Sequence, residues 1–330
     1  MMREPWFWRS TSIAARVATA LMTPVAYAYQ GAHQLRWKLT RPARVSVPVI
    51  CIGNATLGGA GKTPFAMLAA ELLQEEGVRT AFLTRGYGGE LAGPIAVDPN
   101  RHDADDVGDE ALLLARRGPV IVARNRPAGA RLAIERGAQA IIMDDGYQNP
   151  SLHKDVSILL IGADEQTSNG ALFPAGPFRE SVNSASTRAQ ITVSISGHDS
   201  DADFTAWLAP ENPPPPERVV AFAGIGRPQK FFATLQDAGF DIADRIAFPD
   251  HHKFRPADIR ELQKRAAQAN ARLICTEKDF VRLPDEIRKD VLAFPVTMQV
   301  DDRAGLKQRL MRVINQSKPT TPGRDDDAPH

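Results

Sequence analysis

A glycine-rich segment that ends in lysine and threonine is the part of the sequence best suited to bind phosphate. Residues 53–64 read Gly-Asn-Ala-Thr-Leu-Gly-Gly-Ala-Gly-Lys-Thr-Pro, between an apolar run over 45–52 and a helical pattern over 65–75. In such a strand, loop and helix, backbone N–H groups surround the phosphates, the lysine reaches the terminal phosphates and the threonine hydroxyl holds Mg²⁺. The sequence therefore predicts a phosphate-binding site at this loop.

This phosphate loop departs from the usual pattern at its first position, where Thr56 stands in place of a glycine. Two adjacent glycines follow at 58 and 59, so we interpret the segment as a variant loop. A glycine-rich turn can also serve packing alone, but Gly-Lys-Thr in this context favours phosphate binding. The expected nucleotide contacts come from Thr56, Leu57, Gly58, Gly59, Ala60, Gly61, Lys62 and Thr63.

Two adjacent aspartates are the candidates for the metal half of the site. Asp144 and Asp145 come directly after the apolar residues 140–143, which predict a buried strand. Such a strand would bring a carboxylate beside the Mg²⁺ held by Thr63, directly or through water. Paired aspartates are also common turn formers, but the upstream phosphate loop favours a metal site. We therefore expect Thr63, Asp144 and Asp145 to bind Mg²⁺.

Asp109 and His251 are candidates for proton transfer. Asp109 precedes a helical pattern over residues 111–117, where a carboxylate is commonly a helix cap or a first-turn charge. Composition does not decide between that role and a catalytic one. His251 adjoins His252, but no cysteine or well-spaced third ligand accompanies the pair. We favour acid–base chemistry or structural hydrogen bonding over zinc for these histidines.

Two loops are candidates to contact a second substrate. Residues 85–89, Arg-Gly-Tyr-Gly-Gly, follow a predicted strand over 79–84, and open α/β sheets bind ligands at such strand ends. Their glycines are equally explained by a tight turn. The second loop, over 172–180, is too rich in proline and glycine for regular structure. In it, Arg179 could bind a substrate phosphate or pair with Glu180.

Strand and helix patterns alternate along most of the chain. This alternation predicts an α/β fold similar to P-loop nucleotide-binding proteins, with a mainly parallel sheet flanked by helices. We interpret residues 199–217, with prolines at 213–216, as a surface linker, and residues 291–300 as the last strand of a smaller C-terminal α/β lobe. The expected segments are a membrane-associated helical segment at 1–44, a nucleotide-binding core at 45–212, the lobe at 217–315 and a disordered tail at 316–330.

Bulk composition excludes several classes of protein. The 40 basic and 39 acidic residues nearly cancel, so the chain lacks the basic field of a nucleic-acid-binding protein. Cys51 and Cys275 are the only cysteines, which excludes a disulfide framework and a cysteine-rich zinc site. The sequence Thr-Glu-Lys-Asp at 276–279 resembles the guanine-specific Asn-Lys-x-Asp motif, but its lysine is one place too late. Guanine specificity is unsupported.

Residues 1–44 combine aromatic, apolar and cationic side chains, a composition typical of a membrane interface. They contain seven Lys and Arg against Glu4 alone. The uncharged run over 17–29 contains Pro24 and is too short for a comfortable transmembrane helix. We expect aromatic rings at the headgroup level and cations attracted to anionic lipid at a cytoplasmic membrane face. The alternative is an amphipathic helix packed on the protein's own core.

The order of these motifs resembles that of the tetraacyldisaccharide 4'-kinase family of lipid A biosynthesis. The resemblance runs from the N-terminal segment to residue 279, and the shared order is far more specific than any one motif. It rests on residues 53–54 and 58–64, Arg-Gly-Tyr-Gly at 85–88, Gly-Asp-Glu at 108–110, Asp-Asp-Gly-Tyr-Gln at 144–148, residues 174–180, Ala-Gly-Ile-Gly at 223–226, Asp-His at 250–251 and residues 276–279.

The resemblance implies transfer of the ATP γ-phosphate to the 4'-hydroxyl of a lipid A disaccharide 1-phosphate, forming lipid IVA at the cytoplasmic surface of the inner membrane. It implies ATP and Mg²⁺ as cofactors, and the acylated acceptor and the lipid surface as partners, with no nucleic acid. It also implies a catalytic dyad of Asp109 as base and His251 as its orienting partner, with Lys62 stabilising the transferring phosphoryl group. Asn149 stands where many members have histidine, so we assign that position no proton transfer.

The expected acceptor contacts are Arg85, Tyr87, Gln148 and Arg179.

Two other hypotheses remain open from the sequence. A nucleotide-driven metallochaperone or GTPase-like switch would have a similar loop, but the guanine motif and metal-binding cysteines are missing. A membrane-tethered module that binds nucleotide without chemistry would not need both Asp109 and His251. Neither the acyl-chain preference nor the oligomeric state follows from the sequence.

Overall fold

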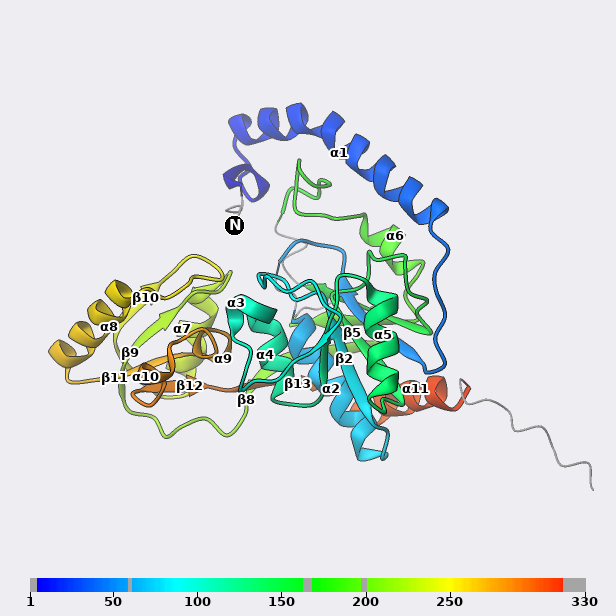
Figure 1. The fold of residues 1–330 in the computed structure, drawn as a ribbon. Helices are drawn as coiled ribbons and strands as arrows, with labels where there is room; N and C mark the ends of the chain where they lie inside the picture. Colours follow the sequence, from blue (N-terminus) through cyan, green and yellow to red (C-terminus); the bar gives the residue numbers. More distant parts are fainter. Residues whose placement is uncertain (1–4, 59–60, 163–167, 197–200, 317–330) are drawn as a thin grey trace, which may run out of the picture.

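The computed structural model describes residues 5–58, 61–162, 168–196 and 201–316, and in this part of the chain two parallel-rich sheets are flanked by helices (Figure 1). The larger sheet has the order β13-β8-β7-β6-β1-β5-β2-β4-β3, and only its edge pairs β13–β8 and β3–β4 are antiparallel. Its strands are β1 (Val49–Asn54), β2 (Thr80–Thr84), β3 (Ile95–Ala96), β4 (Val120–Val122), β5 (Ala140–Asp144), β6 (Val156–Gly162), β7 (Ile191–Ile195), β8 (Phe204–Pro210) and β13 (Val296–Val300).

Helices cover both faces of the larger sheet, so its central strands are buried on both sides. Near-continuous apolar runs such as Val-Ile-Cys-Ile in β1 suit this environment. One face packs against α2 (Lys62–Glu75), α4 (Asp109–Ala115) and α11 (Arg303–Gln316), and the other against α5 (Arg126–Glu135) and α6 (Val182–Ser186). The short helix α3 (Ala104–Val107) precedes α4.

The smaller sheet is wholly parallel, in the order β10-β9-β11-β12. Its strands are β9 (Arg218–Ala223), β10 (Asp241–Ala247), β11 (Arg272–Thr276) and β12 (Val291–Phe294), and its helices are α7 (Pro228–Asp237), α8 (Pro256–Ala269), α9 (Glu277–Phe280) and α10 (Asp285–Arg288). Helix α7 contacts one face of this sheet and α8 the other. The α/β fold with a mainly parallel sheet is confirmed.

Two predictions about connections are wrong. The expected linker over residues 199–217 contains β8, whose Phe204 and Ala206 are buried in the core of the larger sheet. The expected single strand over 291–300 is two strands in different sheets, because Pro295 separates β12 from β13. The chain thus returns to the larger sheet after β12, and α11 then packs against α2. The expected disordered tail lies outside the described residues from 317 onward.

A long helix, α1 (Ile13–Leu39), follows the short 3-10 helix η1 (Trp6–Trp8) and arches over the larger sheet (Figure 1). Ser12 accepts a hydrogen bond from the backbone N–H of Ala15 and caps its first turn. Only Ala15 and Ala26 of this helix are buried. Little of α1 therefore packs on the protein's own core. No helix in the described residues is long and apolar enough to cross a membrane.

Candidate functional site

The phosphate loop connects β1 to α2, as the sequence predicts, and Lys62 is the first residue of the helix. Gly61 has φ 73°, a left-handed conformation that glycine adopts without strain, and a Cβ there would lie 2.8 Å from Met298 Cε. The Lys62 ammonium donates to Asn54 Oδ1 (3.2 Å) and to the Gly58 carbonyl (3.0 Å). The predicted contacts at residues 59 and 60 lie outside the described residues.

Thr63 and Asp144 meet at the carboxyl end of β5. The Thr63 hydroxyl donates to Asp144 Oδ2 at 2.9 Å, while Asp144 Oδ1 is shielded from solvent and has no hydrogen-bond partner among the described residues. Burial, then the nearby negative charges of Glu110 and Asp145, raises the pKa of Asp144 to about 7. An unpaired buried carboxylate oxygen beside a threonine hydroxyl is a donor set that suits Mg²⁺.

Asp145 is held by cations rather than by Thr63. It pairs with Arg179, whose Nη1 lies 2.9 Å from Asp145 Oδ1, and its Oδ1 lies 3.7 Å from Lys62 Nζ. Burial alone would raise the pKa of Asp145, but the charges of Lys62 and Arg179 outweigh it and hold the pKa well below its usual range. Gln148 also joins this group, because its Oε1 accepts from Arg179 and its Nε2 donates to the Asn54 carbonyl.

Asp109 is the first residue of α4, which flanks the larger sheet, and His251 follows β10 of the smaller sheet. His251 Nδ1 lies 2.8 Å from Asp109 Oδ2, and only 3% of the Asp109 side chain is exposed. Burial alone would raise the pKa of Asp109, but the hydrogen bond from His251 and the charges of Lys278 and Arg282 lower it to about 2. Gly108, the residue before Asp109, packs closely on the backbone of Tyr87, since a Cβ there would lie 2.4 Å from the Tyr87 carbonyl oxygen.

Arg282 is a site residue that the sequence pattern did not reveal. Its Nε lies 2.9 Å from Asp109 Oδ2, its Nη1 lies 3.2 Å from Asp279 Oδ1, and its side chain is 5% exposed. Asp279 is fully buried and accepts hydrogen bonds from the Gly224 amide (2.9 Å) and the Thr276 hydroxyl (2.6 Å). The residues at 276–279 and the glycine turn at 224 therefore build a support for Arg282.

Lys278 is a second cation beside the dyad. Its Nζ lies 3.1 Å from Glu110 Oε1 and 3.3 Å from His251 Nε2. Burial alone would lower the pKa of Lys278, but the charges of Glu110 and Asp109 outweigh it and raise the pKa. The sequence offered one signal for Glu110, its place next to Asp109, and none for the contact of Lys278 with His251.

Tyr87, Arg85 and His252 lie outside the hydrogen-bonded groups described above. Tyr87 is 53% exposed, and its ring centroid lies 5.8 Å from that of His251, whereas Arg85 is exposed. His252 pairs with Asp258 at 3.0 Å, apart from the dyad. In the described residues no group of three or more His, Cys, Asp or Glu could hold a metal ion.

The arrangement places an ionised carboxylate, Asp109, at the same edge of the larger sheet as a loop that can surround phosphates. The carboxylate can accept a proton from a hydroxyl, and Lys62 can stabilise charge on a phosphoryl group. These are the two requirements for phosphoryl transfer to an alcohol.

Comparison with known proteins points to one family. The family model described as tetraacyldisaccharide-1-P 4'-kinase matches residues 18–315. Two curated proteins named tetraacyldisaccharide 4'-kinase are similar over nearly their whole length. That of Parvibaculum lavamentivorans is 48% identical over 96% of this chain and 99% of its own, and that of Hyphomonas neptunium is 42% identical over the same shares.

A solved structure has the same fold. The crystal structure of LpxK from Aquifex aeolicus in complex with ATP superposes with a TM-score of 0.72. The two chains are 26% identical, and the match covers 90% of this chain and 99% of the other.

Proposed function

The chain belongs to the tetraacyldisaccharide 4'-kinase family, and we propose that the Asp109–His251 dyad and the phosphate loop carry out that family's reaction. The activity is transfer of the γ-phosphate of ATP to the 4'-hydroxyl of tetraacyldisaccharide 1-phosphate, which forms lipid IVA. The observation that carries the residue assignment is the 2.8 Å contact between His251 and Asp109 at the sheet edge where the phosphate loop ends.

Asp109 acts as the general base. As the acceptor oxygen forms its bond to phosphorus and the bond from phosphorus to the leaving ADP oxygen breaks, the hydroxyl proton moves to the Asp109 carboxylate. A carboxylate with a pKa of about 2 is ionised at neutral pH, so Asp109 is unprotonated when the acceptor binds. His251 orients the carboxylate through its Nδ1 and keeps one oxygen fixed.

The phosphate loop supplies the electrostatic part of the reaction. Lys62 stabilises charge on the transferring phosphoryl group, together with the backbone N–H groups at the start of α2. Thr63 and Asp144 would hold Mg²⁺, with Asp145 close by, since Mg²⁺ at phosphate sites takes one or two carboxylates and completes its shell with phosphate oxygens and water. When bound, the ion would neutralise phosphate charge.

Asp144→Asn tests the metal assignment without relying on turnover. The variant removes the ionisable carboxylate whose Oδ1 has no hydrogen-bond partner among the described residues, so we expect Mg²⁺ to add much less to ATP binding than in the wild type. Thermal melting with ATP alone and with ATP plus Mg²⁺ measures this difference. Asp258→Asn, a carboxylate on α8, should keep the full Mg²⁺ effect, and an unchanged effect in Asp144→Asn would remove this residue from the metal site.

We further infer that Arg282 is a positioning residue for the base. Arg282→Gln removes a positive charge 2.9 Å from Asp109 Oδ2, while His251 keeps its contact with the same oxygen and the charge of Lys278 remains nearby. The pKa of Asp109 then rises, and since the base works only when ionised, the acid limb of the kcat/KM profile should move to higher pH. Arg282→Lys should restore the profile in part, and Arg265→Gln on the surface of α8 should leave it unchanged. A profile unaltered in Arg282→Gln would contradict the inference.

The acceptor contacts stay a proposal based on position. Arg179 and Gln148 form one hydrogen-bonded group with Asp145 near Lys62, and the exposed Tyr87 ring makes an edge contact with the His251 ring. These side chains surround the edge where the 4'-hydroxyl must approach Asp109. Arg85 follows β2 at the same edge.

We propose that α1 holds the enzyme at the membrane face where the acylated acceptor lies. Ile13, Val17, Leu21 and Val25 recur at intervals of four residues and are 80%, 54%, 69% and 52% exposed. Such an apolar stripe on a helix suits the headgroup and acyl boundary.

Replacing Leu21 and Val25 together by Gln should weaken binding to lipid vesicles, by roughly tenfold for each apolar side chain no longer buried in lipid. Vesicle flotation measures this loss. Replacing Trp207 and Leu208 by Gln on β8, which are 41% and 47% exposed, provides the control. Equal binding by the two double variants would refute the role of α1.

Activity is tested by incubating the protein with γ-labelled ATP, Mg²⁺ and an acylated glucosamine disaccharide 1-phosphate. Label at the 4' position is the expected result. Absence of label in the lipid, with protein that is folded and binds ATP, would overturn the assignment.

A further inference from the structure

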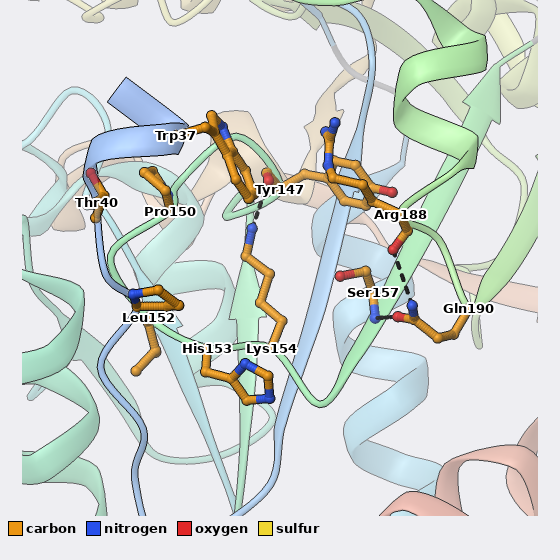
Figure 2. Close-up of a pocket in the computed structure, with 11 residues that line it drawn as sticks. Trp37, Thr40, Tyr147, Pro150, Leu152, His153, Lys154, Ser157, Arg188 and Gln190 are labelled. Atoms are coloured by element: carbon orange, nitrogen blue, oxygen red, sulfur yellow. Dashed lines mark hydrogen bonds between the residues drawn. The ribbon is translucent and has the colours of Figure 1, made fainter. Parts of the chain in front are cut away.

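A cavity of about 240 Å³ lies at the C-terminal end of α1, and none of the residues assigned to catalysis lines it (Figure 2). Trp37 of α1 closes it on one side, and Tyr147 lies opposite. Lys154 and Arg188 both line the cavity. Its size exceeds what a single water needs, so it can take a larger polar group.

Two cations and no carboxylate line this cavity. Lys154 Nζ lies 5.1 Å from the centroid of the Trp37 ring, and Arg188 Cζ lies 4.9 Å from it. Arg188 is paired with Glu180 at 2.5 Å. Among the described residues Lys154 pairs with no carboxylate, and its Nζ donates only to the Tyr147 carbonyl, at 2.6 Å. The side chains that line the cavity thus carry a net positive charge, with Glu180 paired to Arg188 and Asp155 lying 3.7 Å from His153 outside the lining.

Hydrogen-bond donors around the cavity are also left without acceptors. The Trp37 Nε1–H is shielded from solvent and donates to no described residue, and Lys154 has two N–H groups beyond the one bound to Tyr147. Buried polar groups without partners are rare in folded proteins and call for a water or ion. A donor-rich, positively charged cavity calls for an anion.

We propose that this cavity binds the phosphate group of a lipid. Its opening lies beside the last turns of α1, where Leu35 and Leu39 are 57% and 74% exposed and the cations Arg36 and Lys38 are exposed as well. A helix end of this composition lies at the headgroup level of a membrane, which is the depth of lipid phosphates. This step rests on the proposed membrane role of α1.

Two lipids at that surface have such a phosphate: the acceptor, through its 1-phosphate, and an anionic phospholipid. Glu180 connects the cavity to the acceptor residues, because one of its oxygens accepts from Arg188 and the other from Gln148, at 3.1 Å. The acceptor can therefore place its 1-phosphate in the cavity while its 4'-hydroxyl lies near the proposed acceptor residues. Phospholipid binding instead requires only the opening at α1.

Lys154→Gln separates these sources, because glutamine can still donate to the Tyr147 carbonyl but has no charge. Lys154→Arg restores the charge, and Lys38→Gln removes an exposed charge from α1 as a matched control for diffuse attraction to the membrane. We would measure KM for the acceptor with and without its 1-phosphate, KM for ATP, and flotation with phosphatidylcholine vesicles that contain or lack phosphatidylglycerol. Melting curves check that each variant is folded.

If the acceptor's 1-phosphate occupies the cavity, Lys154→Gln raises KM for the acceptor by roughly tenfold or more, the gain expected from a hydrogen bond to a charged group. The increase disappears with the acceptor that lacks the 1-phosphate, and KM for ATP stays unchanged. If a phospholipid occupies the cavity, Lys154→Gln and the wild type have the same KM for the acceptor in detergent. Lys154→Gln then loses more affinity for phosphatidylglycerol vesicles than Lys38→Gln does. Lys154→Arg keeps the wild-type value in either case.

The proposal is overturned if folded Lys154→Gln keeps the acceptor KM and loses no more vesicle affinity than Lys38→Gln. Failure of the proposed function gives a different result, because the wild type would then transfer no label at all. The vesicle comparison needs no turnover and still tests the cavity in that case.

Discussion

Asp109→Asn should lower kcat by about 10²- to 10⁴-fold, the usual contribution of a positioned general base, while ATP affinity changes little. Asparagine has nearly the same shape but cannot take up the hydroxyl proton. Among the described residues, the hydrogen-bond and ion-pair partners of Asp109 are His251, Arg282 and the backbone N–H of Glu110, and none of them belongs to the phosphate loop. Binding of the nucleotide should therefore survive the change.

Steady-state transfer of label and equilibrium binding of ATP test this pair of expectations. Asp258→Asn is the matched control, because it also removes a carboxylate hydrogen-bonded to a histidine, His252 at 3.0 Å, but away from the dyad. It should keep wild-type kcat. Wild-type turnover by Asp109→Asn would remove this residue from the mechanism, and a loss of folding in melting curves would show that its buried charge is chiefly structural.

His251 should depend on Asp109 for its effect. Because the two side chains act as one unit, replacing both should cost about as much as replacing Asp109 alone. The geometry supports this expectation, since His251 has φ 55° and its amide donates to the Gly224 carbonyl at 3.0 Å, which fixes the ring toward Asp109.

The sequence predicts those parts of the site that local strand, loop and helix patterns place. Lys62, Thr63 and Asp144 sit where a strand, loop and helix must place them, because parallel strands end at one edge of the sheet. The contact between Asp109 and His251 could be predicted only from the family resemblance. These residues are 142 positions apart, and no spacing rule joins a helix of one sheet to a loop of another.

Arg282 shows why the rest could not be predicted. It follows α9 in a sequence that is equally typical of a surface turn, and its function depends on Asp279, which in turn depends on the Gly224 amide from a different loop. Similarly, β8 was missed because acidic residues and prolines flank it. Its pairing with β13 is formed by residues about 90 positions later, where Val296 faces Pro210, so the tertiary partner overrides local composition.

Lys62→Ala should weaken both ATP affinity and turnover, in contrast to Asp109→Asn. The ammonium is held by Asn54 Oδ1 and the Gly58 carbonyl at the start of α2, where bound phosphates would replace or join these acceptors. Loss of a charged hydrogen bond predicts roughly 10- to 100-fold weaker ATP binding. Loss of a group that stabilises the transferring phosphoryl predicts a fall in kcat of about 10²- to 10³-fold.

Equilibrium ATP titration and single-turnover transfer measure the two effects separately. Lys264→Ala on α8 removes the same charge far from the loop and should leave both values at wild type. Removing Lys62 also deprives Asp145 of a cation 3.7 Å away, but Arg179 still pairs with that carboxylate, so the fold should survive. Unchanged affinity and rate in folded Lys62→Ala would contradict the phosphate-loop assignment. A fall in the transfer rate with unchanged ATP affinity would instead show that Lys62 stabilises only the transition state.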